Sequence, residues 1–133
     1  MIDAPKQKGN ILLLDDDKFL LDMYSMKFSQ SGYTVEACLS VSQALQILRG
    51  GFAPAVVLFD ITMPEMDGFA SLKTLHDDKL AVSSIKIALT NQNDEAEKAK
   101  AAELGASRYI VKASMIPSEV VNTVDEELAK HHA

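Results

Sequence analysis

Short aliphatic runs alternate with amphipathic segments along the whole chain. The runs are rich in Val, Ile, Leu and aromatic residues, which favour strands, and they end at polar or turn-forming residues. Strands are predicted at residues 11–14, 33–39, 55–59, 85–89 and 109–111. Several of these runs lack the apolar–polar alternation of a half-exposed strand, so we expect them to be buried on both faces.

The segments between the runs have helical periodicity. Asp17 is a suitable N-cap for the first helix, and Gly32 and Gly105 stand where the first and fourth helices should end. The inward candidates of the fourth helix are mostly small, so we expect this helix to be weakly held. They are Ala96, Ala99, Ala102 and, beyond its end, Ala106, with only Leu104 bulky. Helices are predicted at residues 17–31, 41–49, 69–77, 94–104 and 118–130, the last facing inward through Val120, Val121, Val124 and Leu128.

This alternation of strands and helices is typical of an α/β domain, in which helices cover a parallel sheet. The chain has 133 residues, of which 47% are apolar, enough for one domain with a substantial core. We expect residues 1–9 to form a flexible N-terminal tail and residues 10–130 to form the domain.

Charge and composition exclude several classes of function. The net charge is −6 and there is no dense basic segment, which argues against nucleic-acid binding by this domain. The single cysteine, Cys38, permits no internal disulfide and fits a reducing compartment. Because no apolar run approaches the ~20 residues that span a bilayer, we expect no membrane association and a cytoplasmic location.

Chemically active residues stand at the ends of four predicted strands. Asp15 and Asp16 follow the first strand, Asp60 the third, Thr90 the fourth and Lys112 the fifth. In an open parallel sheet, ligands bind beyond the carboxyl ends of the strands. Clustered carboxylates suit a hard cation such as Mg²⁺, and a lysine with a hydroxyl suits a phosphoryl group.

The chain resembles a response-regulator receiver domain of two-component signalling over residues 9–130. The resemblance rests on the acidic pair with "LFDITMPEMDG" (58–68), "ALT" (88–90) and "YIVK" (109–112) in this order. It implies a doubly wound (βα)5 fold, with a five-stranded parallel sheet in the order 2-1-3-4-5 and helices on both faces.

The resemblance also implies a role for each residue of the site. Asp60 would accept a phosphoryl group from a sensor histidine kinase or a phosphotransfer protein. Mg²⁺ would be bound by Asp16, Asp60 and the backbone carbonyl of Thr62, with Asp15 acting mostly through water. Lys112 would pair with the phosphoryl oxygens. The domain would thus be a phosphoacceptor that assists its own phosphorylation, and not an enzyme in the usual sense.

A conformational switch follows from the same resemblance. Thr90 would hydrogen-bond the phosphoryl group, and Tyr109 would then change rotamer. This would alter the surface of the fourth helix, fifth strand and fifth helix, through which a phosphorylation-dependent homodimer can form. The first helix is apolar on more than one face, from Phe19 to Phe28, and in the family this helix helps to dock the kinase.

Some residues depart from the family pattern, and two other functions compete with the receiver interpretation. Asn91 and Ala113 replace a usual small residue and a usual proline, and with Thr62 and Gln92 they bear on the rate and lifetime of phosphorylation.

One competing function is a haloacid-dehalogenase-like phosphatase, which would use Asp15 and Asp17 with Thr90 and Lys112 but leaves Asp60 unexplained. The other is a receiver-like scaffold that binds a partner without being phosphorylated.

Overall fold

Five parallel strands form one sheet in the order β2-β1-β3-β4-β5. This computed structural model describes residues 9–61, 84–90, 95–103, 105–112 and 116–132, and the helix predicted at residues 69–77 lies outside them. The strand order and the parallel pairing confirm the predicted fold. The strands are β1 (Gly9–Leu14), β2 (Tyr33–Cys38), β3 (Val56–Asp60), β4 (Ile85–Thr90) and β5 (Ala106–Val111).

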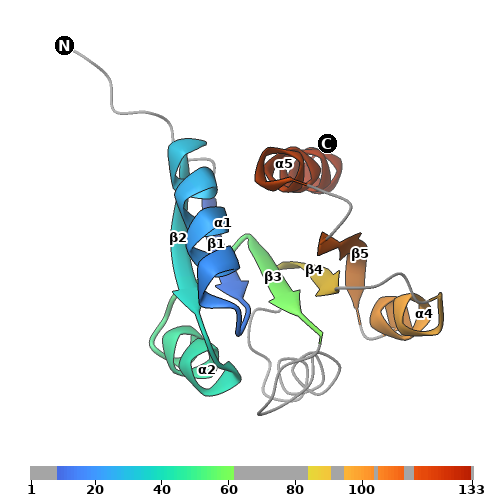
Figure 1. Ribbon diagram of the computed structural model, residues 1–133, viewed down its shortest axis with the longest axis horizontal. Coiled ribbons are helices and arrows are strands. Elements are labelled where there is room, and N and C mark those ends of the chain that lie inside the picture. The colour runs from blue at the N-terminus through green and yellow to red at the C-terminus, as the bar shows by residue number, and fades with distance from the viewer. Residues whose placement is uncertain (1–8, 62–83, 91–94, 104, 113–115, 133) are drawn as a thin grey trace.

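The described helices cover both faces of the sheet. Figure 1 shows α1 (Lys18–Gln30) and α5 (Pro117–His132) on one face, and α2 (Val41–Arg49) and α4 (Glu95–Glu103) on the other. Each face has its own apolar cluster, because the central strands are buried on both sides. None of the helices in the described part of the chain is long and apolar enough to span a bilayer.

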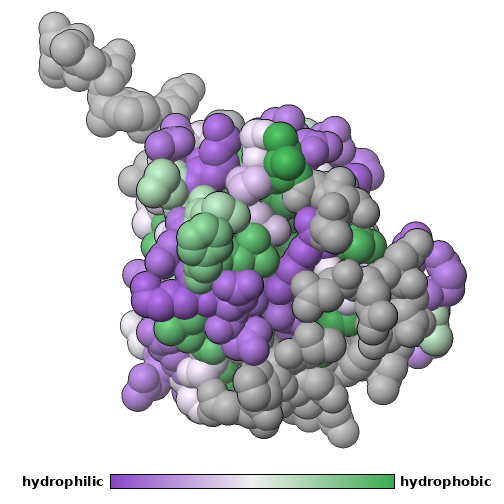
Figure 2. Space-filling view, in the orientation of Figure 1, coloured by the Kyte–Doolittle hydropathy of each residue, from purple (hydrophilic) through white to green (hydrophobic). Residues whose placement is uncertain are grey.

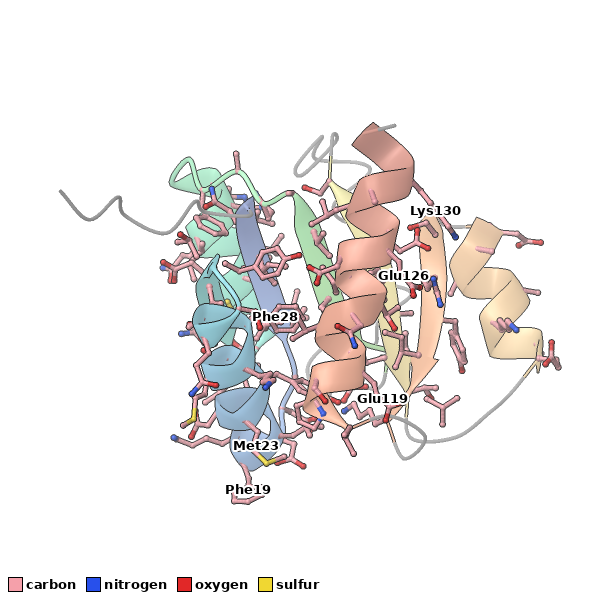
Figure 3. The ribbon with its side chains drawn as sticks, turned by 90° about the horizontal axis from the view of Figure 1, so that it is seen from above. Phe19, Met23, Phe28, Glu119, Glu126 and Lys130 are labelled. Atoms are coloured by element: carbon pink, nitrogen blue, oxygen red, sulfur yellow. The ribbon has the colours of Figure 1, made fainter. Side chains whose placement is uncertain are left out.

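Helix α1 has an inner and an outer apolar face. Its inner face buries Leu21, Tyr24 and Phe28, and Phe28 makes an edge-to-face contact with Tyr33. Figure 3 shows Phe28 turned toward the sheet, whereas Phe19 lies at the exposed end of the helix. Asp17 caps α1 as predicted, since its side chain accepts a hydrogen bond from the backbone N–H of Leu20.

The predicted inner face of α4 is wrong within the helix, although Ala106, just beyond its end, is buried as expected. Ala96, Ala99 and Ala102 are exposed, and Ala101 is buried instead. Four of the nine residues of α4 are alanines and they lie on more than one side of the helix, so the pattern could not identify the inner side. The fifth strand also begins earlier than expected, at Ala106.

Helix α5 is tied to the sheet by polar contacts as well as by its valines. The Tyr33 hydroxyl donates a hydrogen bond to Asp125. Arg108 in β5 donates to Glu127 at 3.1 Å and to Glu126 at 3.4 Å. Glu127 is buried but remains paired, which avoids the cost of an isolated buried charge. These contacts fix β5, which leads directly to Lys112.

We predict that Phe28→Ala lowers the free energy of unfolding by about 3–5 kcal/mol, because it removes a fully buried ring and leaves a cavity. Phe19→Ala on the same helix is the matched control. Phe19 is 75% exposed, so its loss should change stability by less than about 0.5 kcal/mol. Urea denaturation followed by circular dichroism measures both, and equal losses would contradict this assignment of the two faces of α1.

Candidate functional site

Two buried carboxylates meet where the strand order reverses. Leu14 in β1 is the register partner of Phe59 in β3, so the next residues, Asp15 and Asp60, emerge side by side. Both strands are buried there, and both carboxylates are nearly inaccessible. Asp16 is exposed, but one carboxylate oxygen from each of the three residues lies within 4.8 Å of the others. The structure thus brings together the acidic residues that the sequence singled out.

Backbone contacts hold Asp15 in place. Its N–H donates to the Cys38 carbonyl at 3.1 Å, which extends the pairing of β1 with β2. Its Oδ1 accepts a hydrogen bond from the Asp17 N–H at 2.9 Å. The Asp17 side chain is used as the cap of α1, and therefore Asp17 does not join the acidic cluster.

Lys112 connects the two buried carboxylates. Its Nζ lies 2.6 Å from Asp15 Oδ2 and donates a hydrogen bond to Asp60 Oδ2 at 3.0 Å. Because β4 lies between β3 and β5, the side chain must reach past one strand, which the long lysine stem permits. Only 8% of the side chain is exposed. The sequence indicated that Lys112 belongs to this site, but not that it would contact both carboxylates.

The charges at this edge are not balanced by lysine alone. Burial raises the pKa of Asp15, although the Lys112 ammonium and the hydrogen bond from the Asp17 N–H oppose the rise, and the charge of Asp60 raises it further. Burial alone would lower the pKa of Lys112, but Asp15 and Asp60 raise it above its ordinary value. Among the described residues, one ammonium thus contacts two of the three carboxylates in the cluster.

The cluster fits a divalent cation. Asp15 Oδ2 accepts no hydrogen bond of good geometry from any described residue, although it is buried and close to the Lys112 ammonium. Buried oxygens usually accept a hydrogen bond, so this one is available to a ligand. Together with the other two carboxylates it offers the all-oxygen ligand set that hard cations prefer. The donor set therefore supports a metal site, and its chemistry is consistent with Mg²⁺ without specifying that ion.

The proposed switch residues lie next to this cluster in the sheet. Thr90 is the last residue of β4, is buried, and is the register partner of Val111. Tyr109 in β5 is partly buried and packs against the apolar cluster on the α2 and α4 side. Thr62, Asn91, Gln92 and Ala113 lie outside the described residues.

Known proteins match both the sequence and the fold. The family model described as "Response regulator receiver domain" matches residues 11–125. The response regulator SaeR of Staphylococcus epidermidis is 31% identical over 121 residues, covering 91% of this chain and 51% of the relative. The chain thus spans about half the length of the curated relatives it matches.

Two solved structures share the fold over nearly the whole chain. A CheY-like receiver domain protein from Methanospirillum hungatei is 26% identical, with a TM-score of 0.83 and coverage of 97% of this chain and 98% of that chain. The beryllofluoride-activated receiver domain of DrrB, a protein of Thermotoga maritima, is also 26% identical, with a TM-score of 0.77 and coverage of 91% and 97%.

We predict that Asp60→Asn raises the melting temperature of the metal-free chain by about 2–4 °C. The substitution removes the carboxylate that repels Asp15, while the Lys112 ammonium keeps its contact with Asp15 at 2.6 Å. Calorimetry in the presence of a chelator measures the effect. The control is Asp22→Asn, which removes a charge from an exposed ion pair with Lys18 and should leave the melting temperature almost unchanged. A fall in the melting temperature of Asp60→Asn would contradict the prediction.

Proposed function

The chain belongs to the response-regulator receiver domain family, and on that basis we propose that it accepts a phosphoryl group on Asp60 from a phosphohistidine of a sensor kinase or phosphotransfer protein. It is thus a signalling domain. The observation that carries the proposal is the contact between the buried Asp60 carboxylate and the Lys112 ammonium, beside the carboxylates of Asp15 and Asp16. This arrangement supplies a nucleophile, a cation and a candidate metal site at one edge of the sheet.

In the proposed reaction, a carboxylate oxygen of Asp60 attacks the phosphorus of the phosphohistidine. The new bond joins Asp60 oxygen to phosphorus, the bond between phosphorus and the imidazole nitrogen breaks, and the imidazole leaves with that electron pair. Lys112 Nζ donates to Asp60 Oδ2 in the resting site. Attack through the other carboxylate oxygen, Oδ1, would let Lys112 keep this contact.

Positive charge is the main requirement of this transfer, because negative charge develops on the phosphoryl oxygens. Lys112 supplies one cation from within the chain. We propose that the carboxylates of Asp15, Asp16 and Asp60 hold Mg²⁺ together with the Thr62 carbonyl. Bound there, the ion would offset the repulsion between the carboxylates and the incoming phosphoryl group.

The response of the domain is proposed to run through β4 and β5. Phosphorylation adds about one further negative charge to Asp60 at neutral pH. Thr90, at the neighbouring strand end, would hydrogen-bond the phosphoryl group, and Tyr109 would reorient. We propose that the surface formed by α4, β5 and α5 changes in consequence, and that a phosphorylation-dependent homodimer can form through it.

The outer face of α1 is proposed to dock the phosphohistidine-bearing partner. Phe19, Met23 and Met26 are exposed, and with Pro117 they line an open groove of about 430 Å³. Figure 2 shows hydrophobic side chains at the surface over α1, surrounded by hydrophilic ones. The groove lies between α1 and the start of α5. Because α1 follows Asp15 and α5 follows Lys112 in the chain, a partner helix bound in the groove would lie close to Asp60.

The two competing functions are less well supported. A haloacid-dehalogenase-like phosphatase would need Asp17 in the reacting site, but its side chain caps α1. An unphosphorylated scaffold would have no use for a buried, lysine-contacted Asp60. The family match also favours the receiver domain over both.

We predict that the chain gains one phosphoryl group when it is incubated with Mg²⁺ and acetyl phosphate, and that Asp60→Asn abolishes the gain. Intact-mass spectrometry at short times measures it. The matched control is Asp17→Asn, which makes the same substitution in the acidic run but preserves the cap, because asparagine caps helices well. Uptake by Asp60→Asn, or loss of uptake in Asp17→Asn alone, would contradict the assignment.

A second prediction concerns docking. With a histidine kinase that phosphorylates the unaltered chain, the double variant Phe19→Ala/Met26→Ala should accept the phosphoryl group at least about tenfold more slowly, since exposed apolar anchors dominate such interfaces. Its uptake from acetyl phosphate should stay unchanged. Gln46→Ala, on the exposed side of α2, is the control. Equal transfer rates for both variants would exclude docking at this groove.

A further inference from the structure

The outer face of α1 carries a regular stripe of exposed side chains. Phe19 and Met26 are 75% and 63% exposed, and apolar side chains gathered in this way indicate an interaction surface. Spacings of three and four residues place the members of the stripe along one side of the helix. The stripe consists of the α1 residues that line the open groove beside Pro117, namely Phe19, Asp22, Met23, Met26, Lys27 and Gln30.

This stripe is complementary to itself when two copies of α1 lie antiparallel. In a two-fold symmetric pair, residue i of one copy contacts residue j of the other, and j contacts i. With the symmetry axis between Met23 and Met26, each of these methionines lies opposite the other one of the second copy. The same register places Asp22 opposite Lys27, and Phe19 opposite Gln30. Every member of the stripe thus meets another member, which no other antiparallel register of these residues achieves.

The charges on the stripe favour this register. Asp22 is acidic and Lys27 is basic, so opposite charges face each other on both sides of the central methionines. The Asp22 carboxylate also pairs with Lys18 of its own chain at 3.1 Å, and in the dimer it would lie between two lysines. The chain has a net charge of −6, which tends to keep copies apart. The two ion pairs supply local attraction at the place where the apolar side chains gather.

The apolar members of the stripe suit a contact between identical helices. Methionine side chains are unbranched and flexible, so Met23 and Met26 can fill an irregular gap between two helices. The ring of Phe19 would cover the aliphatic part of Gln30, which is itself exposed. Figure 2 shows that hydrophilic side chains surround the apolar patch over α1. A central apolar contact with a polar rim is the usual composition of a protein interface.

We propose that the outer face of α1 is a self-association surface, on which two unphosphorylated copies of this chain pair through antiparallel α1 helices. One helix face is smaller than the surfaces that stable complexes bury, so the dissociation constant should be about 0.1–1 mM. This dimer differs from the phosphorylation-dependent dimer proposed for α4, β5 and α5, since it uses the other end of the sheet and needs no phosphoryl group.

Pairing through α1 would limit access to the docking surface. Phe19 and Met26 are the proposed anchors for the phosphohistidine-bearing partner, and the second copy would cover both. Self-association and docking would therefore exclude each other, so the unphosphorylated chain would hold back its own docking as its concentration rises. This consequence rests on the proposed function, but the pairing of the two helices does not.

The test exchanges the charges of the stripe. Asp22→Lys brings two lysines face to face, and Lys27→Glu brings two carboxylates face to face. Each variant alone should therefore associate roughly tenfold more weakly than the unaltered chain, because two attractions become two repulsions. An equimolar mixture of the two variants should regain the lost affinity, since opposite charges again face each other in the mixed dimer. The double variant Asp22→Lys/Lys27→Glu should regain it for the same reason.

Sedimentation equilibrium at low salt measures the association, with a chelator present and no phosphoryl donor, because salt screens exposed ion pairs. Circular dichroism checks that each variant keeps its helices. Glu103→Lys is the matched control, since it changes the net charge as Asp22→Lys does, at an exposed position on α4. It should associate no more weakly than the unaltered chain. Amide NMR signals of residues 19–30 should shift with concentration, and those of α4 should not.

Three results would overturn the inference. An unaltered chain that stays monomeric up to about 2 mM would leave the groove to a phosphohistidine-bearing partner alone. Association that neither single variant weakens would place the contact elsewhere, for example on α4, β5 and α5. Failure of the mixture to regain affinity would exclude the antiparallel register. A chain that self-associates as expected but takes up no phosphoryl group would refute the proposed function and leave this inference standing.

Discussion

The contact of one ammonium with two buried carboxylates is the interaction on which the site depends. Lys112 approaches Asp15 at 2.6 Å and Asp60 at 3.0 Å, and thereby joins the carboxyl ends of β1, β3 and β5. Buried charges are tolerated only when they are paired. Lysine offsets part of the negative charge, and the remainder leaves the site receptive to a cation. The same pairing that stabilises the buried charges in the free protein thus also leaves a net negative charge for a cation to bind.

The sheet makes this contact possible. The strands on either side of the reversal in strand order are buried on both faces, and their register brings Asp15 and Asp60 to the same level. Helices α1 and α5 pack against one face of this sheet. Fixed backbone, rather than a mobile loop, therefore sets the distance between nucleophile and cation, which suits a reaction that depends on positioning.

Helix α1 links the interior of the site with its surroundings. Its inner face carries Tyr24 and Phe28 into the core, and its outer face exposes Phe19 and Met26. The proposed docking groove and the packing against the sheet thus use opposite faces of one helix. A partner that shifts α1 would also act on the core between α1 and the sheet, because tightly packed cores transmit such displacements.

The sequence by itself determined the order of elements, the fold class and the identity of the acidic residues and the lysine, because strand ends and family motifs are local patterns. It also identified Asp17 as a cap, which depends on neighbours along the chain. It failed for α4, where repeated alanines define no face, and the tertiary structure buried Ala101. Only the tertiary structure decided that Lys112 contacts both carboxylates. These contacts join residues far apart in sequence, and their distances depend on strand register and helix packing, which no local pattern contains.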